Sequence, residues 1–112
     1  MKSKLEKIQE LAEKKKTAKL VKLTHDGDNE VRAAAFRALG SCGDEQAMET
    51  CQNAIRDPEP AIRLAVAEAF QKMGDDHVSE ALRHQMMEET DPQLKEAFKL
   101  AADFNRGRRS GT

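Results

Sequence analysis

Apolar residues recur along most of the chain at intervals of three and four positions, which is the spacing of one face of an amphipathic helix. Between residues 26 and 87 the pattern occurs twice, because residues 26–56 align with residues 57–87 after a shift of 31 positions. The aligned residues are Asp26, Val31, Arg32, Ala34, Ala35, Ala38, Leu39, Gly43 and Asp44 in the first copy and Asp57, Ile62, Arg63, Ala65, Val66, Ala69, Phe70, Gly74 and Asp75 in the second. The sequence therefore predicts a repeated helical hairpin.

Each copy divides into two helices at a Gly-Asp pair, Gly43-Asp44 or Gly74-Asp75. Glycine accepts the left-handed conformation that follows a helix, and aspartate caps the start of the next helix. The second helices carry their own apolar stripes, which are Ala47, Cys51, Ala54 and Ile55 in one copy and Val78, Ala81, Leu82 and Met86 in the other. Prolines lie in the acidic turns, where new helices begin.

Shorter versions of the pattern flank the two copies. The opening stripe is Leu5, Ile8, Leu11 and Ala12, followed by Leu20 and Leu23, and the closing stripe is Leu94, Ala97, Phe98 and Ala101. We predict an all-α fold with helices at about 3–15, 17–24, 29–41, 45–56, 59–73, 76–88 and 92–105. No segment alternates with a period of two, so strands are not expected. The expected organisation is one domain over 1–105, with a partial repeat at 1–25, full repeats at 26–56 and 57–88, a half repeat at 91–105 and a flexible basic tail at 106–112.

The segments DGDNEVRAAAFRALGSCGD and DPEPAIRLAVAEAFQKMGD resemble short bacterial HEAT repeats of the subtype found in phycobilisome lyases. The resemblance implies a right-handed α-α superhelix with its second helices on the concave face. It also implies that Arg32 and Arg63 form a ladder with turn aspartates such as Asp26 and Asp57. Lys95 takes the arginine position in the last unit, and the ladder should weaken there because lysine lacks the planar bidentate guanidinium.

Candidate binding residues are those on the second helices that lie off the apolar stripe and therefore face the groove. They are Lys22, His25, Glu49, Gln52, Asn53, Arg56, Glu80, Arg83, His84 and Met87. Glu49 and Glu80 occupy the same position in the two copies. This repeated carboxylate either binds a partner segment that carries Lys or Arg, or only keeps the face soluble.

Composition and charge limit the classes of ligand. The chain has four Phe and neither Trp nor Tyr, which is unusual for a pocket that holds a flat ligand. Residues 1–25 contain eight Lys and three Glu, residues 26–104 contain eight basic and seventeen acidic residues, and the last eight residues contain three Arg. An acidic body with basic ends is not typical of a nucleic-acid interface, despite the basic segments at 14–16 and 106–109.

Motifs for catalysis are lacking, since the sequence has no phosphate-binding glycine loop, nucleophile elbow or paired metal motif. His77, Glu80 and His84 share one helical face, but a solvated surface is the more common role for such residues. Cys42 and Cys51 lack metal-ligand spacing and suit free thiols in a reducing cytosol. We therefore expect a cytoplasmic protein without catalytic activity, metal or cofactor, and without a membrane segment.

These patterns predict a protein-protein interaction scaffold or adaptor that uses the concave face. The alternatives are a chaperone or lyase-like accessory subunit of an enzyme, and a weak nucleic-acid binder that uses the basic termini. Leu100 and Phe104 lie off the stripe of the last helix, which suggests a homo-oligomer through that helix. The alignment also predicts that Ala34→Glu and Ala65→Glu both unfold the stack.

Overall fold

The computed structural model describes residues 1–109, and over this range it contains seven helices and no strand. The helices are α1 (Lys4–Glu13), α2 (Thr17–Leu23), α3 (Asn29–Cys42), α4 (Glu45–Gln52), α5 (Pro60–Ala69), α6 (Asp76–Glu88) and α7 (Pro92–Asn105). The predicted all-α fold of seven helices is confirmed.

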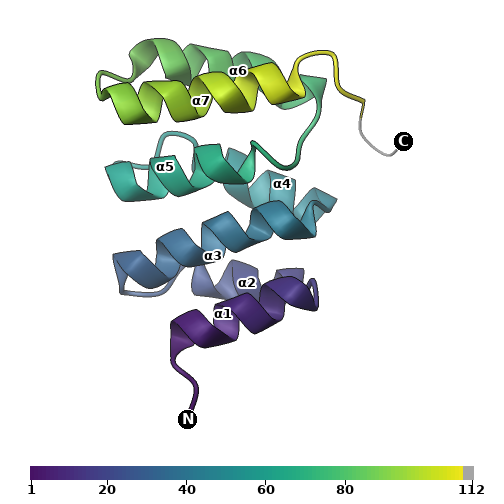
Figure 1. Cartoon of the computed structure of the whole chain (residues 1–112), viewed down its shortest axis with the longest axis vertical. Helices are drawn as coiled ribbons and strands as arrows, with labels where there is room; N and C mark the ends of the chain where they lie inside the picture. Colours follow the sequence, from purple (N-terminus) through teal and green to yellow (C-terminus); the bar gives the residue numbers. More distant parts are fainter. Residues whose placement is uncertain (110–112) are drawn as a thin grey trace.

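The helices form a two-layered stack with principal extents of 42 × 34 × 17 Å. The first helices of the units, α1, α3, α5 and α7, lie one above another, and α2 and α4 lie behind them (Figure 1). Each first helix packs against the next one along the stack. The second layer is less regular, because α4 packs against α2 and α3 whereas α6 packs mainly against α7.

Helix starts follow the capping signals of the sequence. The Asp28, Asp44, Asp75 and Asp91 carboxylates each accept a hydrogen bond from a backbone N–H in the first turn of the helix that follows. Ser3 and Glu6 form a reciprocal capping box at α1. Gly43 has φ 66° after α3, the left-handed conformation in which glycine avoids the steric cost of a side chain.

Helices α4 and α5 are shorter than predicted, since α4 ends at Gln52 and α5 at Ala69. After α4 the backbone N–H groups of Ala54 and Ile55 bond to carbonyls three residues earlier, which makes a tight turn before Asp57-Pro58. Proline disfavours the α conformation of the residue before it, which here is Asp57, so α4 stops in advance of Pro58. Ala54 and Ile55 remain buried within the turn.

The core is centred on α5, which lies between α3 and α7. Ile62, Ala65, Val66, Ala69 and Phe70 are all fully buried, as the repeat alignment predicts. A Cβ atom on Gly40 of α3 would lie only 2.8 Å from the Ala69 Cα atom, so glycine permits the close approach of α3 to α5.

Eight stripe residues are less buried than predicted. Leu5 and Ala81 are exposed, and six are half-buried, namely Leu11, Ala12, Leu23, Ala34, Ala38 and Met86. Ala33, Phe36 and Gly40 are buried instead on α3, because that helix contacts α1, α2, α4 and α5 and is covered over a wider arc. On α6 the face that packs against α7 is the buried one, and it includes Gln85.

A ladder of ion pairs joins the first helices α1, α3 and α5 to the turn that begins the next unit. Lys4 Nζ lies 2.6 Å from Asp26 Oδ2, and Arg32 Nη2 lies 3.1 Å from Asp57 Oδ2. Arg63 does not pair with the Asp57 carboxylate and instead donates to both Glu89 oxygens, at 2.7 and 3.2 Å. Its Nη1 donates to the Asp57 backbone carbonyl at 2.8 Å.

The last rung differs, because Lys95 donates to the Met86 backbone carbonyl at 3.2 Å. Glu89 is the most enclosed of the ladder carboxylates, with a side chain only 4% exposed, and it also accepts a hydrogen bond from Gln85 Nε2 at 2.7 Å. The Arg63–Glu89 pair is therefore the rung whose loss should matter most.

Part of the expected flexible tail is folded against the stack. The Asp76 N–H donates to the Arg108 carbonyl at 2.8 Å, and the Gly107 N–H donates to Asp76 Oδ1 at 2.7 Å. Arg108 Nε donates to the Gly74 carbonyl. Residues 106–109 thus cover the turn before α6, and the remainder of the predicted tail, 110–112, lies outside the described residues.

A charge at Ala65 and a charge at Ala34 should have unequal effects, contrary to the prediction from the alignment. We expect Ala65→Glu to lower the free energy of unfolding by about 3 kcal/mol or more, because the carboxylate would enter a fully packed seam. Ala34 is half-buried, so Ala34→Glu should cost about 1 kcal/mol. Urea denaturation followed by circular dichroism measures both, and equal losses would contradict this burial pattern.

Removal of Arg63 should leave the Glu89 carboxylate enclosed and without its cation. We expect Arg63→Gln to destabilise the fold by about 3 kcal/mol, and Arg63→Lys by less, since lysine keeps the charge but not the bidentate geometry. Arg32→Gln is the matched control, with a smaller loss because its pair is more exposed. Thermal and urea unfolding measure the loss of stability in each variant. A larger loss for Arg32→Gln than for Arg63→Gln would contradict the prediction.

Lys15 is the one non-glycine residue with positive φ among the residues described, at 52°. It follows α1 in a Schellman turn, in which the Lys16 N–H donates to the Leu11 carbonyl and the Lys15 N–H to the Ala12 carbonyl. We expect Lys15→Gly to stabilise the protein by about 1 kcal/mol, because glycine adopts this conformation without steric strain. An unchanged or lower midpoint of urea unfolding would show that the turn carries no such strain.

Candidate protein-binding face

The ten predicted binding residues are all exposed, and they lie on the second-helix face, the surface formed by α2, α4, α6 and the turns that follow them. Lys22 is on α2, Glu49 and Gln52 are on α4, and Glu80, Arg83, His84 and Met87 are on α6. His25, Asn53 and Arg56 lie in the turns after α2 and α4, since α4 ends earlier than predicted. The structure distributes these residues among separate sites along the face.

One site is the α4–α6 hollow, a depression of about 230 Å³ between the two helices. It is lined by Glu45, Met48, Glu49, Gln52, Phe70, Asp75, His77 and Val78. Among the predicted residues only Glu49 and Gln52 belong to it. The hollow exists because α6 leans on α7 and makes little contact with the short α4.

The α4–α6 hollow combines acidic and apolar groups. Glu45 and Glu49 are exposed and make no ion pair within residues 1–109. The Asp75 carboxylate accepts the His77 backbone N–H at 2.9 Å and lies 3.3 Å from His77 Nδ1. Half-buried Met48 and buried Val78 both line the hollow, so apolar atoms lie beside the carboxylates. Such a site suits a side chain with an aliphatic stem and a cationic end.

A second depression, the α2–α4 hollow, has a volume of about 280 Å³. Its lining consists of Val21, Thr24, His25, Arg32, Phe36, Thr50, Asn53, Ala54 and Asp57. The ladder pair Arg32–Asp57 lies in this lining, so its two charges compensate each other. The α2–α4 hollow is therefore less acidic than the α4–α6 hollow.

Glu80 differs from Glu49 even though the two occupy equivalent positions in the repeat. Arg83 on the same helix donates to both Glu80 oxygens, and this hydrogen bonding lowers the pKa of Glu80. Glu49 has Gln52 at the position equivalent to Arg83 and gains no such partner. The sequence carried this signal, because a partner three residues later on a helix is a neighbour.

Arg56 and His84 gather around a different carboxylate. Arg56 Nη2 lies 4.0 Å from Glu88 Oε2, and His84 Nε2 lies 3.5 Å from Glu88 Oε1. Met87, next to Glu88, is 63% exposed. None of these residues lines either hollow.

Several residues of the α4–α6 hollow were not among the predicted ones. Glu45, Asp75 and His77 belong to the first turns of helices or to caps, whereas the prediction considered only later positions on the second helices. Met48 and Val78 are apolar, and apolar residues on a helix are typical of the core. Their common surface depends on the angle between α4 and α6, which no local pattern encodes.

The Cys51 thiol lies outside both hollows. Burial raises the pKa of the Cys51 thiol to about 12, and its Sγ donates to the Phe36 carbonyl, so this thiol stays protonated.

Within the part of the chain that the structure describes, no three His, Cys, Asp or Glu side chains are grouped as metal ligands would be. No described helix is both long and apolar enough to cross a membrane.

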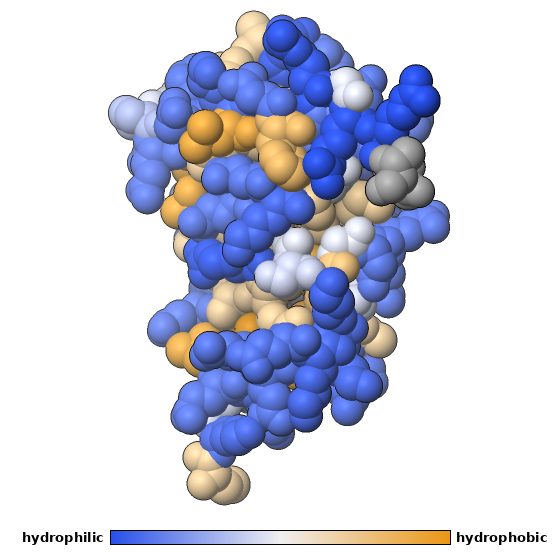
Figure 2. Space-filling model, turned by 45° about the vertical axis from the view of Figure 1, so that its right-hand side comes forward, coloured by the Kyte–Doolittle hydropathy of each residue, from blue (hydrophilic) through white to orange (hydrophobic). Residues whose placement is uncertain are grey.

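The predicted oligomer surface on α7 is small. Leu100 is 47% and Phe104 38% exposed, and the Arg108 guanidinium lies 4.4 Å from the centroid of the Phe104 ring. Figure 2 shows apolar atoms on the viewed face only in small groups between hydrophilic side chains. Self-association through α7 stays a prediction.

Comparison with curated proteins and with solved structures gives no match. A family model described as HEAT repeats matches residues 17–102. The matched span runs from the start of α2 into α7 and includes both copies of the 31-residue unit. Repeated hairpins, their stacking and this match agree, and the chain belongs to the HEAT-repeat family.

Proposed function

We propose that the protein is a non-catalytic scaffold or adaptor whose second-helix face binds a basic segment of a protein partner. Stacked helical repeats form extended binding surfaces, and proteins built from HEAT repeats generally mediate protein-protein interactions. The observation that carries the proposal is the α4–α6 hollow, in which the unpaired carboxylates of Glu45 and Glu49 lie beside an apolar lining.

A lysine or arginine side chain fits this arrangement. Its methylene groups would cover Met48 and Val78, and its cationic end would lie among Glu45, Glu49 and Asp75. At about 230 Å³ the hollow is smaller than the roughly 300–1,000 Å³ of typical small-molecule sites. A single side chain of a partner is therefore a better match than a cofactor.

The placement of the basic segments argues against a nucleic-acid partner. The lysines at 14–16 follow α1, while the arginines at 106–109 follow α7 at the other end of the stack (Figure 1). The acidic body separates them, so they do not form one basic track. An accessory role beside an enzyme, as a chaperone or lyase-like subunit, is the alternative proposal.

We further infer the bacterial, phycobilisome-lyase subtype of HEAT repeat and a cytoplasmic location. The 31-residue unit supports the subtype, since it is shorter than the roughly 40–47 residues of other HEAT repeats. Cys42 and Cys51 are free thiols, which supports a reducing compartment.

The two repeated glutamates provide a matched pair of variants. Glu49→Lys should abolish capture of partners that carry a basic segment, because it places a cation in the α4–α6 hollow. Glu80→Lys makes the same change of charge outside both hollows, and this variant should still capture those partners. Pull-down from cytosol with mass spectrometry, followed by titration of each captured partner, measures the difference.

Circular dichroism should show the same helical content for both variants, since both positions are exposed. We expect Glu49→Lys to weaken a captured partner by about tenfold, equivalent to roughly 1.4 kcal/mol. Equal binding by the two variants would refute the role of the α4–α6 hollow.

A further inference from the structure

The N-terminal end of the stack carries a surface of opposite charge to the α4–α6 hollow. A depression of about 480 Å³ lies there, between α1, α2 and the turn that joins them. Five lysines surround it together with Glu10 and Leu11, and we call it the lysine hollow; the lysines are Lys2, Lys7, Lys14, Lys16 and Lys19. In sequence these residues extend over eighteen positions, and the α1–α2 hairpin brings them together.

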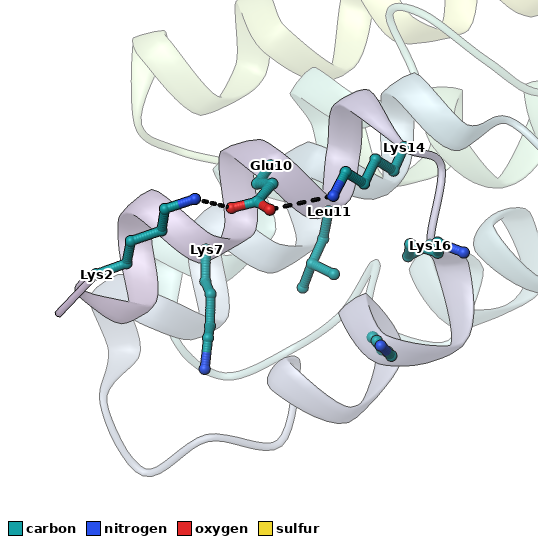
Figure 3. Close-up of a pocket in the computed structure, with 7 residues that line it drawn as sticks. Lys2, Lys7, Glu10, Leu11, Lys14 and Lys16 are labelled. Carbon is teal, nitrogen blue, oxygen red and sulfur yellow. Dashed lines mark hydrogen bonds and ion pairs between the residues drawn. The ribbon is translucent and has the colours of Figure 1, made fainter.

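The single carboxylate of the lysine hollow is already compensated. Lys2 and Lys14 both donate to Glu10, with the Lys14 bond at 3.2 Å, and these hydrogen bonds lower the pKa of Glu10 (Figure 3). Lys7, Lys16 and Lys19 make no ion pair within residues 1–109. The lysine hollow therefore retains three ammonium groups whose charge no carboxylate of the described chain compensates.

The turn after α1 helps to produce this cluster. Lys15 adopts the left-handed conformation, so the chain reverses sharply and α2 begins at Thr17, directly beside α1. Lys16 and Lys19 consequently face the same depression as Lys7. Figure 3 shows Leu11 pointing to the same side of α1 as Lys7, toward the space below the helix.

Leu11 gives the lysine hollow an apolar centre. It is half-buried and lines the hollow, so part of its side chain is open to a ligand. A ligand that fits would carry carboxylates for the ammonium groups and an apolar side chain for Leu11. We propose that the lysine hollow binds an acidic polypeptide segment of a protein partner, with one apolar residue placed between carboxylates.

Nucleic acid fits this surface less well. The four phenylalanines are at positions 36, 70, 98 and 104, so α1 and α2 offer no aromatic ring on which a base can stack. Glu6 and Glu13 line an adjoining depression on α1 and would repel a phosphate backbone that continued past the lysine hollow. This cluster of uncompensated positive charge is confined to the lysine hollow, and a short acidic segment would match it in extent.

A defined peptide tests the proposal. We would measure fluorescence anisotropy of a labelled peptide of repeating Glu-Glu-Leu with the full chain, and of a Glu-Glu-Ser peptide that has the same charge. The Glu-Glu-Leu peptide should bind more tightly, because only leucine covers Leu11. Its affinity should fall on raising the salt from about 50 to about 300 mM, since the contacts are ionic.

Two double variants distinguish the effect of the lysine hollow on peptide binding from the effect of net charge. Lys7→Glu with Lys19→Glu should weaken the Glu-Glu-Leu peptide by about tenfold or more. Lys72→Glu with Arg106→Glu changes net charge equally at exposed positions outside the lysine hollow and should leave binding within about twofold of the original. Circular dichroism of all variants checks the fold.

Three outcomes would overturn the proposal. The first is no binding of the Glu-Glu-Leu peptide at low salt, and the second is equal weakening by the two double variants. The third is tighter binding of labelled duplex DNA than of the peptide, which would assign the surface to nucleic acid. Because Glu49 and the α4–α6 hollow are not involved, failure here leaves the proposed scaffold function unaffected.

Discussion

The contact between α3 and α5 is the interaction on which the rest of the stack depends. Gly40 brings the two backbones so close that a Cβ atom would overlap Ala69, and α5 in turn is buried between α3 and α7. Small side chains at this seam allow Phe36, Leu39 and Phe70 to fill the space beside it. Neither unit could bury these apolar surfaces alone, so each repeat needs its neighbour.

The ion-pair ladder is the polar counterpart of that seam. Each rung ties a cation on a first helix to a carboxylate in the turn that begins the next unit, and so fixes the position of one unit relative to another. The rungs differ in burial, with Lys4–Asp26 at the exposed end and Arg63–Glu89 the most enclosed. Buried pairs of this kind define geometry more than they add stability.

The two candidate binding surfaces have different structural origins. The α4–α6 hollow appears where α6 packs on α7 and makes little contact with α4, and the lysine hollow lies in the α1–α2 hairpin. Their charges are opposite and they lie on different parts of the molecule. A scaffold with these two surfaces would hold a basic segment and an acidic segment at the same time, which suits an adaptor between two proteins.

The sequence by itself determined the helices, their caps and the repeat, because amphipathic spacing, Gly43 and the capping aspartates act within a few residues. The resemblance to HEAT repeats identified Arg32 and Arg63 as ladder residues. Only the tertiary structure decided that Arg63 pairs with Glu89, that Glu49 lines a hollow while Glu80 does not, and that the lysines of residues 2–19 converge. The first two outcomes depend on where α4 ends and on how α6 packs against α7, and the third depends on how α2 packs against α1. Packing between elements sets each of these arrangements.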